Sequence, residues 1–484
     1  MSPPQGTLTL SLISHTNAGK TTLARTLLRR DVGEVLDQAH VTDENQEYVM
    51  LDAEPDAASD AARSRLVVWD TPGFGDSMRL LQRLEGERNP LAWMLKQTWD
   101  RFTDRPLWCS QQAVKHVRGQ TDAVLYLANA SEDPAMAGYV EPEMKILGWI
   151  GKPVVVLLNQ TGPHHQRGAR LEDEGRWRDH LAPHEVVKDV VSLDAFARCW
   201  VQEGLLLERI RDVLPVERAA LMEELIERWT ARNLEVFHGA TRRLGEWLGA
   251  AAADREALGR SAAGRLERRR AADALARRLE KETRQASADL IALHGLEGQA
   301  ADLVRARIED VSAPREKPQP WKASVIGGAA GGALGGLVAD VAVGGLSFGG
   351  GAVAGAILGA MGLGGLAWAY QQIGDSADPR ITWSDEFLDR SARDALLRYL
   401  AVAHFGRGGG EFREREHPGF WRDAVEAALS SRRGACHDVW EIARGGEPDS
   451  QRASERLVPV LEACLREILL AFYDGVDRFL GRPR

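Results

Sequence analysis

Cysteine is scarce in this chain, which has only Cys109, Cys199, Cys436 and Cys464 among its 484 residues. The four lie far apart, and none belongs to a CxxC pair or to a Cys/His spacing typical of metal ligands. The sequence therefore shows no disulfide framework and no cysteine-based metal centre. A reduced, cytosolic compartment is expected.

An excess of basic residues is also missing. The chain has 61 Lys and Arg against 70 Asp and Glu, which gives a net charge of −9. We therefore expect no nucleic-acid partner. The first ten residues, MSPPQGTLTL, lack a basic region followed by an apolar run, so we predict no signal peptide and a cytoplasmic protein.

What the chain does contain, between residues 7 and 195, is a series of short and nearly continuous apolar runs. Runs of this kind are typical of strands buried on both faces of a parallel sheet. Helical stretches separate them, which predicts a doubly wound, mostly parallel α/β domain with ligands at the carboxyl ends of its strands. The candidate strands are 7–13, 65–70, 122–128, 153–159 and 190–195, with 47–53 as a candidate edge strand.

A phosphate-binding pattern follows the first candidate strand. A phosphate cradle needs inward backbone N–H groups, a lysine for the β- and γ-phosphates and a hydroxyl for Mg²⁺. Gly19, Lys20 and Thr21 supply the second half of that pattern. The alternative is a chance GKT at a helix start. The candidate nucleotide-binding residues of this loop are Ser14, His15, Thr16, Asn17, Ala18, Gly19, Lys20, Thr21 and Thr22.

A second motif, DTPG at Asp70–Gly73, ends the third strand in the chain. An aspartate there can hold Mg²⁺ through water, and the Gly73 N–H can meet a γ-phosphate. Pro and Gly also favour ordinary turns, so DTPG alone is weak. A phosphate loop followed by a strand and DxxG is far more specific than either part.

Together these motifs resemble the translation-factor-type GTPases, with the Era and TrmE branch closest. The resemblance covers about residues 7–195 and rests on Asn17, on Thr42 twenty-two residues after Lys20, and on Asp70–Gly73. It implies a P-loop fold and a GTP/GDP switch. Lys20, Thr42 and Gly73 would act at the γ-phosphate, and Thr21, Thr42 and Asp70 would hold Mg²⁺. Thr42 is otherwise a solvated loop residue. Asn17 either helps to bind an activating K⁺ ion, as in relatives, or only supports the loop.

Three departures from that family pattern matter. Ser14 replaces the leading glycine, which is the mildest change. Phe74 follows DTPG, where some GTPases place the glutamine that orients the attacking water, so slow intrinsic hydrolysis is expected. The family motif NKxD is Asn159, Gln160, Thr161 and Gly162 here.

The third departure bears on base recognition. Gly162 stands where an aspartate would accept two hydrogen bonds from guanine, and losing such an acceptor weakens discrimination. An ATPase therefore stays an alternative. Ser192 and Asp194 lie where the fifth motif belongs, and they either touch the base or are only strand-end residues.

From about residue 216 the pattern becomes helical. One apolar stripe predicts an amphipathic helix, and the residues of that stripe are Leu221, Leu225, Trp229, Phe237, Leu244 and Leu248.

A glycine-rich tract interrupts this helical region. Residues 323–374 contain one charge, Asp340, and glycine recurs at i, i+4, as at Gly327, Gly331 and Gly335. This repetition predicts a closely packed helical hairpin, a glycine zipper. Each arm approaches the roughly 20 apolar residues that a membrane span needs. Contact with lipid at the inner face of the membrane is favoured slightly over a hairpin buried in the C-terminal domain.

The whole arrangement resembles a bacterial family in which an Era-like GTPase domain precedes a helical domain of unknown function with a glycine zipper. We predict a GTPase domain over 1–215, a helical region over 216–320, the hairpin over 321–374 and a second helical region over 375–484. The leading hypothesis is a slow, Mg²⁺-dependent GTPase switch. The alternative is a membrane-associated scaffold or remodelling protein that binds nucleotide with little turnover. Homo-oligomerisation stays open.

Overall fold

The computed structural model of the chain describes most of its residues. The described ranges are 6–15, 19–28, 46–53, 64–74, 76–85, 87–96, 105–159, 167–193, 199–259, 265–296, 298–312, 370–373, 379–405, 419–445 and 449–481.

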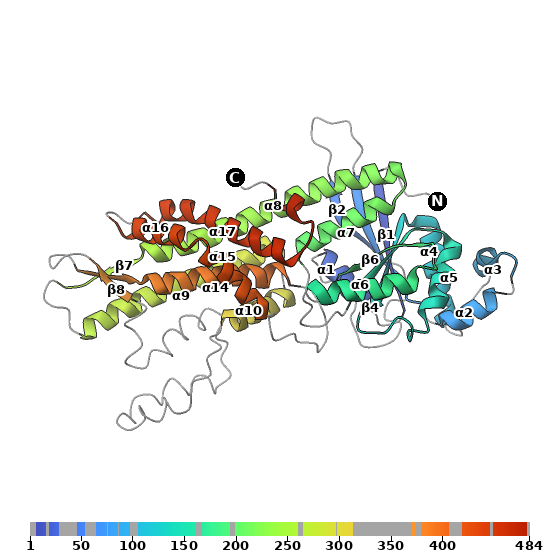
Figure 1. The fold of residues 1–484 in the computed structure, drawn as a ribbon, viewed down its shortest axis with the longest axis horizontal. Helices are drawn as coiled ribbons and strands as arrows, with labels where there is room; N and C mark the ends of the chain where they lie inside the picture. The colour runs from blue at the N-terminus through green and yellow to red at the C-terminus, as the bar shows by residue number, and fades with distance from the viewer. Residues whose placement is uncertain are drawn as a thin grey trace, which may run out of the picture. The chain divides into compact units, whose positions relative to one another are not determined.

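A six-stranded sheet forms the centre of the N-terminal region (Figure 1). Its strands are β1 (Thr7–Ser14), β2 (Gln46–Ala53), β3 (Ser64–Asp70), β4 (Ala123–Asn129), β5 (Val154–Asn159) and β6 (Val187–Ser192). The strand order is β2-β3-β1-β4-β5-β6. All neighbours are parallel except β2, which runs antiparallel to β3 at the edge. The predicted doubly wound α/β domain and its edge strand are therefore confirmed.

Helices alternate with these strands and cover both faces of the sheet (Figure 1). Local sequence sets several of their ends. Asp76 caps one helix by accepting a hydrogen bond from the Arg79 N–H at 3.0 Å, and Gly151 ends another in the left-handed conformation. The helices of this region are α1 (Lys20–Leu28), α2 (Ser77–Leu84), α3 (Pro90–Lys96), α4 (Arg105–Gln120), α5 (Val140–Ile150), α6 (Arg167–Leu181) and α7 (Trp200–Val213).

The core of the sheet consists of the apolar runs recognised in the sequence. Every residue of β5 is buried, and in β4 only the final Asn129 is partly exposed. One face packs on α4 and α5, where Val114, Val117, Met144 and Leu147 join a single apolar cluster. Burial on both faces explains why these strands read as continuous rather than alternating apolar sequence.

The second half of the chain is mainly helical, as predicted. Its helices are α8 (Val216–Ala253), α9 (Arg265–Leu293), α10 (Gln299–Ser312), α14 (Asp385–Ala403), α15 (Gly419–Ser430), α16 (Arg433–Arg444), α17 (Ser450–Phe472) and α18 (Asp477–Leu480). The apolar stripe predicted from residue 221 lies on α8. Trp229, Phe237, Leu244 and Leu248 of that stripe are buried.

The expectation of an all-α C-terminal region needs one correction. A three-stranded sheet is present, with the order β7-β9-β8 and both pairs antiparallel. Its strands are β7 (Arg255–Ala257), β8 (Tyr370–Ile373) and β9 (Arg380–Trp383). Strands of three or four residues are too short to show an alternating pattern, so no sequence signal marks them.

Strand β8 also bears on the predicted glycine hairpin. That hairpin was expected over 321–374, but residues 370–373 form β8 and pair with β9. Residues 321–369, which carry the glycine repeats, lie outside the described residues. Among the helices that the structure describes, none combines the length and apolar character needed to cross a membrane.

The chain divides into two compact units whose limits differ from the predicted domain boundaries. One unit combines residues 1–238 with 403–414 and 466–482, and the other combines 239–402 with 415–465 and 483–484. The first unit therefore contains the sheet, the first part of α8 and a segment from near the C-terminus.

Aromatic packing joins the separate segments of the first unit. On α18, the Phe479 ring meets Trp229 of α8 edge-on, with ring centroids 6.2 Å apart. Gly204 of α7 leaves room for this ring, because a Cβ there would lie 2.9 Å from two Phe479 carbons. Trp200 and Phe237 complete the cluster.

Candidate functional site

The two sequence motifs meet at the carboxyl ends of β1 and β3. Ser14 ends β1, Lys20 begins α1, and Asp70 ends β3. The Lys20 Nζ donates a hydrogen bond to the Ser14 Oγ at 3.0 Å. The Thr21 Oγ1 donates to the Asp70 Oδ2 at 2.7 Å. Residues separated by about fifty positions in sequence therefore form one polar site, at the edge where parallel sheets bind ligands.

Lys20 is buried in this site. Burial lowers the pKa of its ammonium group, and the negative charges of Asp70 and Glu143 act in the opposite direction. A buried ammonium group can donate charge-assisted hydrogen bonds to an anion that reaches it. A phosphate group has the charge and the oxygen acceptors for that interaction.

Gly73 lies directly against the phosphate loop. A Cβ at this position would be 3.0 Å from the Lys20 Nζ and 3.2 Å from the Ser14 backbone oxygen. The segment is also held by two hydrogen bonds, from the Phe74 N–H to the Ser14 oxygen at 3.1 Å and from the Thr71 hydroxyl to the Leu12 oxygen at 2.6 Å. The glycine of DTPG thus allows the backbone to approach Lys20 closely.

Phe74 points away from this polar site. Its side chain is fully buried in the apolar cluster that includes Ile13, Leu80 and Leu84. An aromatic ring in that position has no group that could orient a water molecule, as the sequence indicated.

The base-recognition candidate Asn159 also lies beside the phosphate loop. It ends β5 and is fully buried. Gly19 has a φ of +89°, and a Cβ on it would be 2.7 Å from the Asn159 Nδ2. The left-handed backbone favours glycine at position 19, and a Cβ there would force the Asn159 amide to shift.

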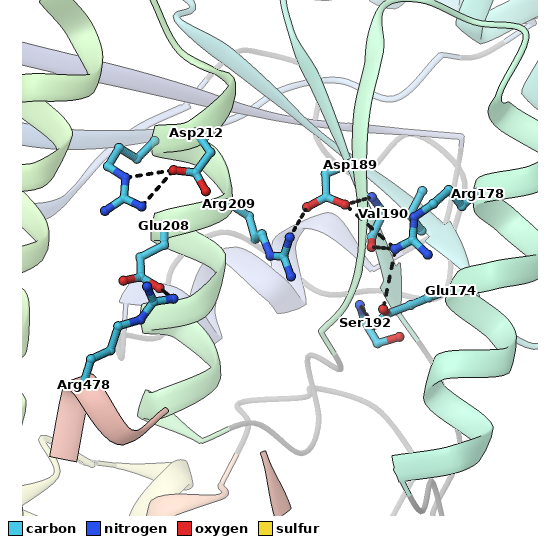
Figure 2. Close-up of polar contacts among 10 residues, drawn as sticks. Glu174, Arg178, Asp189, Val190, Ser192, Glu208, Arg209, Asp212 and Arg478 are labelled. Atoms are coloured by element: carbon cyan, nitrogen blue, oxygen red, sulfur yellow. Dashed lines mark hydrogen bonds and ion pairs between the residues drawn. The ribbon is translucent and has the colours of Figure 1, made fainter. Parts of the chain in front are cut away.

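Ser192 ends the neighbouring strand β6 and pairs with Leu158 of β5. Figure 2 shows Glu174 of α6 beside it, and the Glu174 Oε1 accepts a hydrogen bond from the Ser192 N–H at 2.9 Å. Arg178 donates to the Val190 oxygen at 3.1 Å. These contacts tie α6 to the end of β6, next to Asn159. Whether Ser192 touches a base stays a prediction.

Several predicted site residues lie outside the described residues. The list is Thr16, Asn17, Ala18, Thr42, Gln160, Gly162 and Asp194. Of the others, Thr22 is buried on α1. The roles assigned to all of these residues stay predictions.

Magnesium is the ion that the family resemblance implies. The hydroxyl of Thr21 and the carboxylate of Asp70 are hard oxygen donors, which Mg²⁺ prefers, and they lie within hydrogen-bond distance of each other. The residues present therefore fit Mg²⁺. Within the described residues, no group of three or more His, Cys, Asp and Glu side chains could hold a metal ion.

Sequence reasoning missed Glu143. This fully buried glutamate of α5 contacts His15 of the phosphate loop, with 2.8 Å between the Glu143 Oε1 and the His15 Nδ1. A signal was present, because Glu143 shares the buried face of α5 with Val140, Ile146 and Leu147 at helical spacing. A carboxylate on an apolar helix face needs polar partners.

Comparison with known families adds two matches. Residues 182–457, more than half of the chain, match the family described as a domain of unknown function (DUF3482). Residues 9–160 match the family described as 50S ribosome-binding GTPase, which supports GTP binding. No curated protein sequence matches the chain.

Solved structures with similarity to this chain include a single-residue variant of Era from Aquifex aeolicus bound to GDP and AlF4⁻, at 16% identity and a TM-score of 0.30. Era in complex with MgGDPNP and a segment of 16S ribosomal RNA also matches, at 16% identity and a TM-score of 0.31. In both cases the match covers 43% of this chain and 57% of the Era chain. The chloroplast translocon components atToc33 and psToc159 match at 13% identity and a TM-score of 0.25, over 43% of this chain and 83% of the other.

Proposed function

This chain belongs to the DUF3482 family, and we propose that it works as a GTP-binding, Mg²⁺-dependent switch that hydrolyses GTP slowly. The observation that carries the proposal is the assembly of Lys20, Thr21, Asp70 and Gly73 at one site, from two motifs far apart in sequence. The match of residues 9–160 to a GTPase family supports it.

Each of these residues has a defined task in the proposal. Lys20 exchanges its hydrogen bond with Ser14 for contacts to the β- and γ-phosphates. Thr21 and Asp70, together with Thr42, would hold Mg²⁺, which would supply positive charge beside the phosphates. The Gly73 backbone passes close to Lys20. Its N–H would stabilise charge that develops on the γ-phosphate.

The position of Phe74 supports the proposed slow hydrolysis. Its ring packs in the apolar core beneath the site, so the residue after DTPG cannot orient water. Turnover therefore depends on how the site positions the γ-phosphate and stabilises its charge. A partner, or an ion such as K⁺ near Asn17, could add a further stabilising group.

The nucleotide preference is the first property to test. Purified full-length protein would be titrated with fluorescent GTP, GDP and ATP in the presence of Mg²⁺. We expect GTP and GDP to bind, and Lys20→Ala to weaken both by a hundredfold or more, since a charge-assisted contact to phosphate is lost. Lys115→Ala, an exposed lysine of α4, is the matched control and should bind like the wild type.

Two outcomes would change the proposal. Binding unaffected by Lys20→Ala would exclude the phosphate-loop site. ATP binding tighter than GTP binding would assign the chain to the ATPases. This comparison matters because Gly162 stands where an aspartate would bind guanine.

A membrane location is the second part of the proposal. Its support is the sequence of 323–374, with one charge and repeated glycines. Deletion of 323–369 leaves β8 intact, so the full chain and this shortened chain can be compared by fractionation and by vesicle flotation. We expect only the full chain to float. If both chains stay in the soluble fraction, the membrane location is wrong.

A further inference from the structure

A buried polar cluster lies directly beside the phosphate loop and centres on the carboxylate of Glu143. One carboxylate oxygen lies 2.8 Å from the His15 Nδ1, and the other accepts a hydrogen bond from the Tyr126 hydroxyl at 2.7 Å. The Ser77 side chain also hydrogen-bonds to this carboxylate. Glu143 thus contacts β4, the residue after β1 and the first residue of α2.

This cluster is costly to form and therefore needs all of its partners. Glu143 is fully buried, and burial raises the pKa of its carboxyl, while the hydrogen bonds from His15, Tyr126 and Ser77 lower it. A buried carboxylate without such donors would destabilise the fold. A hydrophobic residue on the same helix face would pack without this requirement.

His15 is held through both its side chain and its backbone. Its ring stacks on Tyr139, with centroids 4.3 Å apart and planes 16° from parallel. The Tyr139 hydroxyl in turn donates to Glu132 at 2.7 Å. On the backbone side, the His15 oxygen accepts a hydrogen bond from Ser14, and His15 forms a parallel bridge with Phe74.

Ser77 connects the cluster to the segment that follows DTPG. It is the first residue of α2, it is buried, and only the short stretch from Phe74 to Asp76 separates it from Gly73. Movement of Gly73 toward a γ-phosphate would therefore act on Ser77, and through the shared carboxylate on His15.

We propose that Glu143 is a positioning residue that couples the phosphate loop, through His15, to the segment after DTPG, through Ser77. The inference rests on the proposed nucleotide binding at this site. GDP has no γ-phosphate that Gly73 could contact, whereas GTP would engage both the phosphate loop and Gly73. The coupling therefore favours GTP specifically, because the two segments reach their bound positions together.

The test measures binding of GDP and of a non-hydrolysable GTP analogue to full-length variants. Glu143→Ala should weaken the analogue about tenfold more than GDP, within the usual range of coupling between sites. Glu143→Gln keeps hydrogen-bonding groups for His15, Tyr126 and Ser77, and should recover most of the loss. The matched control is Glu141→Gln, an exposed residue of the same helix that pairs with Lys145 and His184, and both affinities should stay unchanged.

A double-mutant cycle provides a second test that does not need Glu143→Ala to fold. His15→Ala and Ser77→Ala are each milder changes, and their effects on analogue affinity should deviate from independence by about threefold or more. In the Glu143→Gln background the deviation should persist, since the bridging group is retained. Thermal unfolding of every variant would show that each one is folded at the temperature of the binding measurement.

The outcomes separate this inference from the proposed function. If the wild type binds neither nucleotide, the proposed function fails. If the wild type binds both, the coupling is wrong when His15→Ala and Ser77→Ala act independently. It is also wrong when Glu143→Ala lowers thermal stability while the ratio of analogue to GDP affinity stays unchanged, because the cluster would then only stabilise the fold.

Discussion

Ser14 stands where phosphate loops usually carry glycine, and its hydroxyl is used twice. It accepts a hydrogen bond from the Lys20 ammonium and donates one to the His15 backbone oxygen. A glycine would leave the buried Lys20 without this acceptor. Ser14 thus holds Lys20 in place by a contact that a phosphate group can replace.

At the same scale, His116 of α4 gives the fold a dependence on pH. Its ring lies on Trp69, with centroids 4.3 Å apart, and burial lowers its pKa to about 4. The folded state therefore favours the neutral ring. The stabilisation is complete above the ordinary histidine pKa of about 6.5, and it is lost as the pH falls toward 4.

His116→Phe tests this dependence, because Phe fills a similar volume and cannot be protonated. Between pH 7 and pH 4 the wild type should lose more free energy of unfolding than the variant, by roughly 3 kcal/mol at most. Urea denaturation at a series of pH values would measure the difference, and the comparison cancels the carboxylates that titrate in both proteins. Parallel curves for the two proteins would show that His116 is not the cause.

At the residue scale, the sequence predicted the site residues that belong to motifs with a fixed order and spacing along the chain. Lys20, Thr21, Asp70 and Gly73 follow one another at known spacings, so their meeting could be predicted. Glu143 could not be assigned in this way, because its contact with His15 spans 128 positions. Its partner is set by how α5 packs on the sheet, which no local pattern encodes.

At the scale of the elements, small residues control how closely helices approach. On α8, Gly245 and Gly249 face α17, and a Cβ at Gly249 would lie 2.7 Å from the Ser450 backbone oxygen. Backbone atoms cannot move aside as a side chain can. This pair of glycines, four residues apart, therefore sets the distance between α8 and α17.

Gly249→Ala should destabilise the protein by about 1–3 kcal/mol, because the added methyl group forces the two helices apart. Gly434→Ala on α16 is the control, since the space around a Cβ there is open and alanine favours a helix. Its effect should be neutral or slightly stabilising. Equal stability of the two variants in chemical denaturation would mean that the contact relaxes freely.

The elements themselves differ in how well the sequence predicts them. Strands β1, β3, β4 and β5 were evident because burial on both faces demands continuous apolar sequence. Strands β7, β8 and β9 were missed because each is only three or four residues long, and β7 takes its hydrogen bonds from β9, which lies far along the chain. The helical hairpin predicted from the glycine repeats of 323–369 stays a prediction.

At the scale of the whole molecule, the compact unit that contains the sheet does not end with the first 215 residues. Arg218 of α8 donates to Asp122 at 2.9 Å and to the Thr7 backbone oxygen at 2.5 Å. Phe479 and Trp229 cover the aromatic surface of α7 around Trp200. The sequence suggested a boundary at 215 because the hydrophobic pattern changes there, and this change marks the end of the sheet rather than the end of the unit.

A shortened chain of residues 1–215 should therefore unfold at a lower temperature than the full chain, by roughly 10 °C or more. It loses the Arg218 contacts and exposes Trp200. A chain of residues 1–238 should be intermediate, because it regains Arg218, Trp229 and Phe237 but still lacks Phe479. Equal melting temperatures for all three chains in the presence of GDP would contradict this order.

The return of α18 to α7 has a consequence for synthesis on the ribosome. The segment 466–482 can join the first unit only after residues 239–465 have been added. At 5–20 residues per second that takes roughly 10 to 45 seconds. During this time Phe479 has not yet been added, so the surface around Gly204 is uncovered. The part of the protein that is translated first is thus among the last to be completed, and a nascent chain stalled in this interval presents exposed tryptophan to the chaperones around it.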